Sequence, residues 1–357
     1  MTETFSPPLR SHPLPLPLQD PPYCDDTVTT PDFPKLSGYT LTRSIGRGNT
    51  SLVFLGSANN APERPLAIKV PLGTTLANRT AAERFGNEVR LSLQLRHPYL
   101  VRGYAGTPFG PGAYLAMRYF PAGTLAERLE ETLLPHDAAL RVLADVASGV
   151  AYLHHQGAVH QDIKTQNVYL DDERAALGDF GNTYFVSAGG NVSGSPFYMA
   201  PEIYHGEASS AQSDVYSLGV LAYELLSGMR PHVGNSYEEL MISHLTRFPS
   251  PVTASNRQVP RPLSRLIELA MAKKPQDRPS SAALRRALLE ALGEEDEQIE
   301  LEDLPENASA PAARAIMGRH QHLPTLPTPR DLASSAEPDN RPGKPEPKSW
   351  NPFKRKK

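Results

Sequence analysis

The chain has 357 residues, 39% of them hydrophobic, which is enough for a sizeable packed core. Its 36 basic and 39 acidic residues leave a formal charge of −3, which excludes the global positive field that attracts nucleic acid or an anionic membrane. The single cysteine, Cys24, excludes an internal disulfide and a thiolate metal site.

The first residues, MTETFSPPLRSHPLPLPL, lack the long apolar core of a signal peptide, and no later run approaches the roughly 18 uninterrupted apolar residues of a membrane span. We therefore expect a soluble protein, and the lone cysteine fits a reducing, cytoplasmic setting. Residues 1–37 hold many prolines and little periodic apolar pattern, which predicts a disordered arm.

From Tyr39 the chain changes to short β-rich runs, YTLTRSIG, SLVFLGSA and PLAIKVPL, which are separated by Gly, Asn and Pro. These runs predict an antiparallel sheet. Residues 80–95 then show helical spacing of Phe85 and Val89 and stop before His97-Pro98, where proline disfavours helix. We expect this one helix to pack on the sheet.

The segment AYLAMRYFPAGTLAERL returns to strand and then helix, which indicates a crossover into a larger helical lobe. Residues 137–155 carry apolar side chains at three- and four-residue steps, which predicts a core helix. These side chains are Leu140, Leu143, Val146, Ala147, Val150 and Leu153. The segment DVYSLGVLAYELLSG is apolar nearly all round, the pattern of a helix buried inside a domain.

Further helices are expected through about Leu292. After Gly293 an acidic run, EEDEQIELEDLPE, leads into proline-rich sequence that ends in WNPFKRKK. We expect residues 294–357 to form a flexible tail, whose basic end is solvated rather than bound to a partner.

The first candidate site residues lie in the sheet. The sequence from Ile45 to Val53 places Gly46 and Gly48 in an expected hairpin, where missing side chains let backbone amides approach a phosphate, although an ordinary glycine hairpin explains the pattern equally well. Downstream, Ala67-Ile68-Lys69 puts a lysine in an apolar strand, where an unpaired ammonium is costly.

Glu88, on the predicted helix, is the natural partner of Lys69. This pairing would leave Lys69 to hold the α- and β-phosphates of a nucleotide. The alternative is a surface lysine whose stem lies along the sheet while its ammonium reaches water.

Three further motifs follow in order: HQDIKTQN at residues 160–167, Asp179-Phe180-Gly181, and Ala200-Pro201-Glu202. Together with the glycine loop, AIK, the helix glutamate and DVYSLG, they resemble the eukaryotic-type, or Hanks-type, protein serine/threonine kinase family, in a soluble bacterial-like form. The resemblance covers about residues 39–292. It implies an α+β bilobal protein-kinase fold, with a small antiparallel β-rich lobe carrying one main helix and a larger helical lobe.

By this resemblance, residues 38–293 form the kinase domain, divided into lobes at 38–120 and 121–293. The implied activity is transfer of the ATP γ-phosphoryl group to Ser/Thr hydroxyls of proteins, including autophosphorylation, with Mg²⁺ or Mn²⁺ as the metal. Protein substrates are the implied partners; neither nucleic acid nor a membrane span is expected, and no oligomeric state is assigned.

The resemblance also assigns roles to individual residues. Asp162 would accept or orient the substrate hydroxyl proton, and Lys164 matches the serine/threonine branch, where it would contact the transferred phosphate. Asn167 and Asp179 would hold the metal ions. The alternative for each is an ordinary turn or capping residue, because Asp and Asn favour such positions.

The implied nucleotide-binding residues lie in the glycine loop, the first strands, the hinge and the floor of the cleft. They are Ile45, Gly46, Gly48, Val53, Ala67, Lys69, Glu88, Met117, Tyr119 and Tyr169. Met117 occupies the gatekeeper position, and Tyr169 stands where the family usually has an aliphatic residue below the adenine ring, which suggests stacking.

The segment SGSPFYMAPE resembles the end of an activation segment that docks substrate. Its Ser195 stands where threonine is common, and we expect this hydroxyl to bond Asp162 and Lys164; a simple turn is the alternative. Glu202 and Arg278 are expected to form a structural ion pair. Asp214 is expected to brace the catalytic loop backbone. The histidines show no spacing typical of a metal site.

Three positions depart from the family pattern. Gln161 replaces the usual arginine between His160 and Asp162, and an uncharged amide cannot pair with a phosphorylated activation loop. We therefore hypothesise that activity does not require phosphorylation of this loop. Tyr169 is the second departure, and Arg118, in place of a common acidic hinge residue, is the third.

Two other functional classes compete with an active protein kinase. A pseudokinase acting as a nucleotide-binding signalling scaffold is the main alternative, because fold and function separate easily. A small-molecule kinase of the aminoglycoside phosphotransferase type is the other, although SGSPFYMAPE and DVYSLG belong to the protein-kinase pattern.

Overall fold

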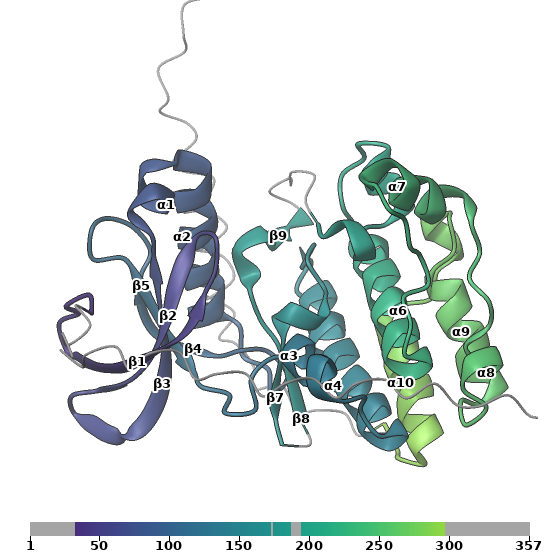
Figure 1. The fold of residues 1–357 in the computed structure, drawn as a ribbon, viewed down its shortest axis with the longest axis horizontal. Coiled ribbons are helices and arrows are strands. Elements are labelled where there is room, and N and C mark those ends of the chain that lie inside the picture. The colour runs from purple at the N-terminus through teal and green to yellow at the C-terminus, as the bar shows by residue number, and fades with distance from the viewer. Residues whose placement is uncertain (1–32, 173, 187–193, 297–357) are drawn as a thin grey trace, which may run out of the picture.

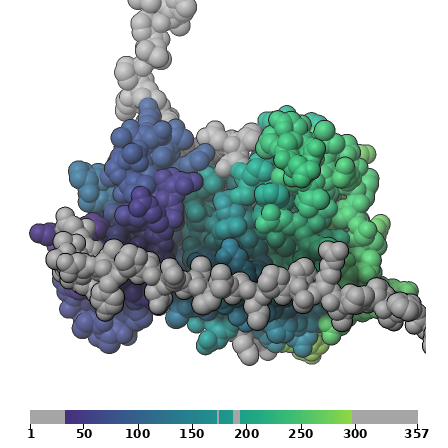
Figure 2. Space-filling view, in the orientation of Figure 1, coloured from purple at the N-terminus to yellow at the C-terminus, as the bar shows by residue number. Residues whose placement is uncertain are grey.

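The computed structural model describes residues 33–172, 174–186 and 194–296, which form two lobes that lie side by side (Figures 1 and 2). The predictions of a disordered arm at 1–37 and a flexible tail at 294–357 fall almost wholly outside these residues. In the described part of the chain, no helix combines the length and apolar character needed to cross a membrane.

The smaller lobe is built on one five-stranded antiparallel sheet. Its strands run in the spatial order β1 (Tyr39–Arg47), β2 (Ser51–Ala58), β3 (Ala61–Pro71), β5 (Tyr114–Arg118) and β4 (Gly103–Thr107). The three β-rich runs of the sequence form the first three strands, so the predicted sheet is confirmed. β3 lies at its centre, and its register places Lys69 opposite Leu115 and Ala67 opposite Met117.

Two helices follow β3, a short α1 (Gly73–Ala77) and the longer α2 (Arg79–Gln94). The Asn78 side chain caps α2 by accepting a hydrogen bond from the Ala81 amide, a common use of asparagine at a helix start. Phe85 and Val89 of α2 are buried against the sheet, as their spacing predicts. The face of α2 that carries Glu88 is thereby fixed toward β3.

The chain leaves the sheet after β5 and enters the helical lobe through α3 (Leu125–Glu131). Thr124 and Glu127 form a capping box at its first turn. The two core helices predicted from apolar spacing are present as α4 (His136–His155) and α6 (Ala211–Ser227). Both lie in the large apolar core, and nearly every residue from Ser213 to Leu226 of α6 is buried.

The other helices of this lobe lie in the green and yellow part of Figure 1. They are α5 (Pro201–Tyr204), α7 (Tyr237–Thr246), α8 (Val252–Ser255), α9 (Arg261–Ala270) and α10 (Ser281–Leu292). Two small antiparallel sheets of two strands each lie nearest the first lobe: β6 (Ala158–Val159) with β9 (Tyr184–Phe185), and β7 (Val168–Asp171) with β8 (Arg174–Leu177). The expected α+β bilobal fold is confirmed, and these small sheets carry the loops that face the first lobe.

Candidate active site

Lys69 on β3 forms an ion pair with Glu88 on α2. Its Nζ donates to both carboxylate oxygens, at 2.6 and 2.7 Å, and the two side chains are only 14% and 7% exposed. A buried ammonium needs such a partner, so the pairing predicted from the apolar strand is confirmed. The alternative of a lysine whose ammonium reaches water is wrong.

Asp179 brings a third charge to this pair from the helical lobe. Burial lowers the pKa of Lys69, but the carboxylates of Asp179 and Glu88 outweigh it and raise the pKa overall, so the lysine stays charged. In turn the Lys69 ammonium lowers the pKa of Asp179, against the effect of burial. The two lobes therefore meet at one lysine and two carboxylates.

The segment after Asp179 is held against α2. Asp179 has a left-handed backbone (φ 63°), which aspartate tolerates better than most residues. Asn87, next to Glu88, donates through Nδ2 to the carbonyls of Phe180, at 3.2 Å, and Thr183, at 2.6 Å. Phe180 is fully buried. The position of α2 and the position of Asp179 are thus coupled.

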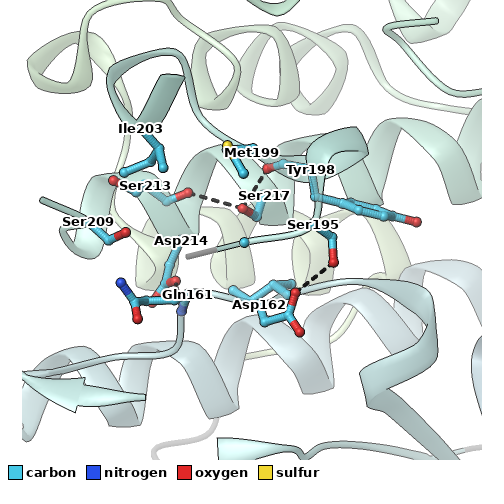
Figure 3. Close-up of a pocket in the computed structure, with 12 residues that line it drawn as sticks. Gln161, Asp162, Ser195, Tyr198, Met199, Ile203, Ser209, Ser213, Asp214 and Ser217 are labelled. Atoms are coloured by element: carbon cyan, nitrogen blue, oxygen red, sulfur yellow. Dashed lines mark hydrogen bonds between the residues drawn. The ribbon is translucent and has the colours of Figure 1, made fainter. Parts of the chain in front are cut away.

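The loop that follows β6 presents Asp162. Ser195 Oγ donates to Asp162 Oδ1 at 2.8 Å, and Lys164 Nζ donates to Asp162 Oδ2 at 2.7 Å and to Ser195 Oγ at 3.0 Å. Figure 3 shows the Ser195 and Asp162 side chains pointing toward each other. The predicted contacts of Ser195 are confirmed, and they fix the orientation of the Asp162 carboxylate.

Asn167 lies on the inner side of the same loop. Its Nδ2 donates to the Asp162 backbone carbonyl at 2.8 Å and to Asp162 Oδ2 at 3.1 Å. This amide therefore ties the start of β7 to the carboxylate.

Asp214 of α6 holds the backbone of the Asp162 loop. The carboxylate accepts from the amides of His160, at 2.7 Å, and Gln161, at 2.9 Å. Gln161 has a positive φ of 70°, a costly conformation for a residue other than glycine. The predicted bracing by Asp214 is confirmed, and it gives a reason why the loop keeps this backbone shape.

His154 is a third partner of the Asp214 carboxylate, with its Nε2 3.0 Å from Oδ2. No group of three or more His, Cys, Asp or Glu side chains with metal-binding geometry occurs among residues 33–172, 174–186 and 194–296.

The expected nucleotide-binding residues line one apolar region between the lobes. Ala67 and Met117 lie in the buried core of the small lobe, and Ile45, Val53, Tyr119 and Tyr169 pack against it. Gly46 and Gly48 lie in the hairpin of β1 and β2, where the Gly48 amide donates to the Ser51 carbonyl at 2.9 Å. Residues from both lobes therefore meet at one apolar surface beside Lys69.

Tyr169 on β7 forms the helical-lobe side of this surface. Its ring lies 5.6 Å from that of Phe120, centroid to centroid, and one ring carbon lies close to Gly178. Burial raises the pKa of Tyr169 to about 12, so the phenol is neutral. An aromatic ring is thus available for stacking where the family has an aliphatic side chain.

Sequence reasoning missed several contacts that shape the site. Asn87 carries no motif, although its place next to Glu88 was a possible signal. Arg118 pairs with Asp171 across the hinge, and its guanidinium lies over the Phe120 ring, 4.9 Å from the ring centroid. These two contacts explain why an arginine stands at a position that the sequence alone left without interpretation. Thr183, two residues after Gly181, is buried and therefore a poor target for phosphorylation.

The two side chains expected to hold a metal ion, Asp179 and Asn167, have oxygen atoms of the kind that Mg²⁺ binds. Mg²⁺ prefers oxygen ligands and is commonly bound by one or two carboxylates together with substrate phosphates rather than by an all-protein cage. Asp179, an ionised carboxylate, and Asn167, which has an amide oxygen, supply such a partial set.

An ion pair outside the site holds the end of the activation segment. Arg278 Nη1 and Nη2 each donate to one oxygen of Glu202, both at 2.7 Å, and Ser213 Oγ also donates to Glu202. Burial opposes ionisation of Glu202, but the hydrogen bonds from Arg278 outweigh it and lower the pKa. The predicted pair is confirmed as a fork with two parallel hydrogen bonds.

Comparison with known proteins identifies a family and several relatives of this chain. Residues 39–289 match the family described as protein kinase domain. The serine/threonine-protein kinase PknL of Mycobacterium tuberculosis is 34% identical over 266 residues, which cover 72% of this chain and 66% of PknL. The serine/threonine-protein kinases PknB of M. tuberculosis and Mycolicibacterium smegmatis are each 31% identical, over 70% of this chain and 42% of their own length. The chain therefore spans just under two thirds of PknL and less than half of PknB.

We predict that Arg278→Ala lowers the free energy of unfolding by about 3–5 kcal/mol, because it leaves the buried Glu202 carboxylate without its partner. Denaturant unfolding of the two proteins measures this difference. Arg265→Ala is the matched control, since Arg265 pairs with Glu268 on an exposed face and its loss should cost less than about 1 kcal/mol. Equal stabilities of the two variants would contradict a structural role for the buried pair.

Proposed function

This chain belongs to the protein kinase family, and we propose that it is an active protein serine/threonine kinase that transfers the γ-phosphoryl group of ATP to protein hydroxyl groups. Two observations carry this proposal. The charge of Asp179 acts on Lys69 across the lobes, with the Lys69–Glu88 pair formed. Asn167, which bonds the Asp162 carboxylate, also accepts at its carbonyl from the amide of Gly178, the residue before Asp179, at 2.9 Å. Phosphoryl transfer requires positioning and charge stabilisation rather than covalent work by the protein, and these groups supply both.

Within this proposal, ATP binds with Mg²⁺ or Mn²⁺ between the lobes. Asp179 and Asn167 would hold the metal, and Lys69 would hold the α- and β-phosphates while Glu88 fixes its ammonium. When bound, the metal neutralises charge on the phosphate oxygens. The apolar surface that includes Ala67, Met117 and Tyr169 would receive the base.

Asp162 is the proposed general base. Its carboxylate would accept or orient the proton of the substrate hydroxyl, as a side chain within hydrogen-bond reach of that proton can do. Lys164, 2.7 Å from Asp162 Oδ2, would contact the transferred phosphate. Both side chains bond Ser195, so the activation segment is linked to the reacting groups, and the acceptor must approach beside Ser195.

The two competing classes are less well supported. A pseudokinase scaffold needs none of these catalytic contacts, yet the Lys69–Glu88 pair and the Asp162–Lys164 pair are both formed. A small-molecule kinase has no need of a segment that docks a polypeptide, whereas Ser195 to Glu202 is anchored at both ends by Asp162 and Arg278. Protein substrates are therefore the proposed partners.

We further propose that residues 38–293 are the catalytic unit, with lobes at 38–120 and 121–293, and that the protein acts in the cytoplasm. The family match at 39–289 and the single cysteine support this assignment.

Replacing Asp162 tests its proposed role as the base. Asp162→Asn keeps the shape of the side chain but removes its capacity to accept a proton, so we expect phosphate transfer to a generic protein substrate to fall at least about a hundredfold. Radiolabelled ATP measures the transfer. Asp172→Asn is the control, because Asp172 is exposed and its left-handed backbone suits asparagine. Transfer by Asp162→Asn at the wild-type rate would exclude the proposed role.

Replacing the serines of the activation segment tests whether its phosphorylation is needed. Because Gln161 carries no charge to pair with a phosphate, the double variant Ser187→Ala/Ser193→Ala should transfer phosphate within about threefold of the wild type, less than about 1 kcal/mol in activation free energy. Ser187 and Ser193 lie outside the described residues. Ser195→Ala, in the same segment, should be impaired because it removes the contacts to Asp162 and Lys164. Inactivity of the double variant would show that loop phosphorylation is required.

A further inference from the structure

A cation lies over an exposed aromatic ring at the surface next to the activation segment. The Arg230 guanidinium is 4.3 Å from the ring centroid of Phe197, and Phe197 is 37% exposed. Arg230 Nε also donates to Glu224 Oε1 at 3.0 Å. Arg230 and Phe197 together are called the Arg230 patch below.

Both carboxylate oxygens of Glu224, beside the patch, accept hydrogen bonds. Tyr198 Oη donates to Glu224 Oε2 at 2.6 Å, while Arg230 occupies the other oxygen. The Glu224 side chain is 15% exposed, against 35% for Arg230. The charge that faces water is therefore the guanidinium, and a basic side chain that approached this surface would meet a cation.

Arg230 keeps hydrogen-bonding capacity at its outer end. Only Nε makes a hydrogen bond within the described part of the chain, so Nη1 and Nη2 are available in the planar fork that suits a carboxylate or phosphate. The Phe197 ring beneath and the Glu224 carboxylate beside it hold the guanidinium in place, which reduces the entropy that a bound anion would have to offset.

The patch is near the site where the acceptor hydroxyl must lie. Ser195, bonded to Asp162 Oδ1, is two residues before Phe197, and two residues span at most about 7.6 Å of Cα trace. Adding the side chains puts Arg230 within roughly 20 Å of Asp162, the length of about six extended residues. A peptide with its hydroxyl at Asp162 can therefore reach Arg230.

The support of the patch is rigid. Tyr198 is buried, its Oη lies 3.4 Å from Thr165 Oγ1 in the catalytic loop, and its carbonyl accepts from Ser217 Oγ at 2.7 Å. The same residue that orients Glu224 thus belongs to the scaffold that carries Asp162. A substrate contact at Arg230 and a hydroxyl at Asp162 are held at a fixed separation.

We propose that Arg230 is a specificity-determining residue, and that the preferred substrates carry an anionic side chain within about six residues of the phosphorylated hydroxyl. This inference rests on the proposed kinase activity. Aspartate, glutamate and phosphoserine share the chemistry that the guanidinium fork recognises, and the experiment separates them.

The test uses the full chain and a set of serine peptides that differ only at the positions flanking the acceptor, where each carries alanine, aspartate, glutamate, phosphoserine or lysine. The readout is the ratio of kcat/KM for each charged peptide to kcat/KM for the alanine peptide, with radiolabelled ATP. We expect ratios of about threefold to tenfold for an anionic side chain at one or more positions, and ratios below one for lysine at the same positions.

Variants of Arg230 should move these ratios in a defined direction. Arg230→Glu should reverse the preference toward lysine, and Arg230→Ala should also shift it toward lysine, because Glu224 Oε1 loses its partner. Arg230→Lys, which keeps the charge but not the fork, should retain part of the preference for anions. Met229→Ala is the matched control: Met229 is adjacent, exposed and uncharged, so the ratios should not change.

Binding is measured in parallel, by fluorescence anisotropy of the same peptides with the acceptor serine replaced by alanine. Phosphate transfer with no preference for anions, or a preference unchanged in Arg230→Glu, would overturn this inference alone. Anion-dependent binding without any transfer would overturn the proposed activity and support the Arg230 site. Neither transfer nor a difference in binding would overturn both.

Discussion

The contact between Lys69 and Glu88, within the small lobe, is the constraint on which the arrangement of the site depends. A buried ammonium is tolerated only beside an anion, so β3 and α2 must approach until Nζ reaches the carboxylate, at 2.6 Å. Asp179 adds a second anion from the other lobe and is itself ionised because of Lys69. One lysine thus links the sheet, the helix and the segment that begins the activation loop.

The rest of the site is held by carboxylate and amide side chains that form hydrogen bonds to the protein backbone and are not expected to touch the substrate. Asp214 holds the amides of His160 and Gln161, and Asn87 holds the carbonyls that follow Asp179. Each of these side chains stands on a core helix, α6 or α2, whose position is set by apolar packing. Gln161 keeps its costly backbone conformation because its own amide and that of His160 are both bonded to Asp214. This backbone shape sets the position of Asp162, the next residue.

Much of this could be predicted from the sequence. Apolar spacing locates α2, α4 and α6, and the need to pair a buried charge identifies Glu88 as the partner of Lys69. The contacts of Ser195 and the pair of Glu202 with Arg278 follow from the resemblance to the protein kinase family, since residues 76 positions apart carry no local sign of contact.

Other contacts could not be predicted, because they depend on tertiary packing of side chains that have no motif. Asn87 reads as an ordinary polar residue of a helix until Phe180 and Thr183 are placed beside it. Arg118 is interpretable only when β7 brings Asp171 across the hinge. The Arg230 patch brings together Phe197, from the short 3-10 helix before α5, and Arg230, from the loop after α6. The contacts of such polar residues become visible only when the fold has brought their partners beside them.

The central claim is that Lys69, held by Glu88, positions ATP for transfer to protein hydroxyls. The most direct measurement is radiolabelled phosphate incorporation into a generic protein substrate by the full chain with Mg²⁺ and by its Lys69→Met variant, followed by identification of the modified residues. We predict incorporation at serine and threonine by the wild type and its loss, by at least about a hundredfold, in Lys69→Met. Equal incorporation by both proteins, or none by a folded wild type, would contradict the account.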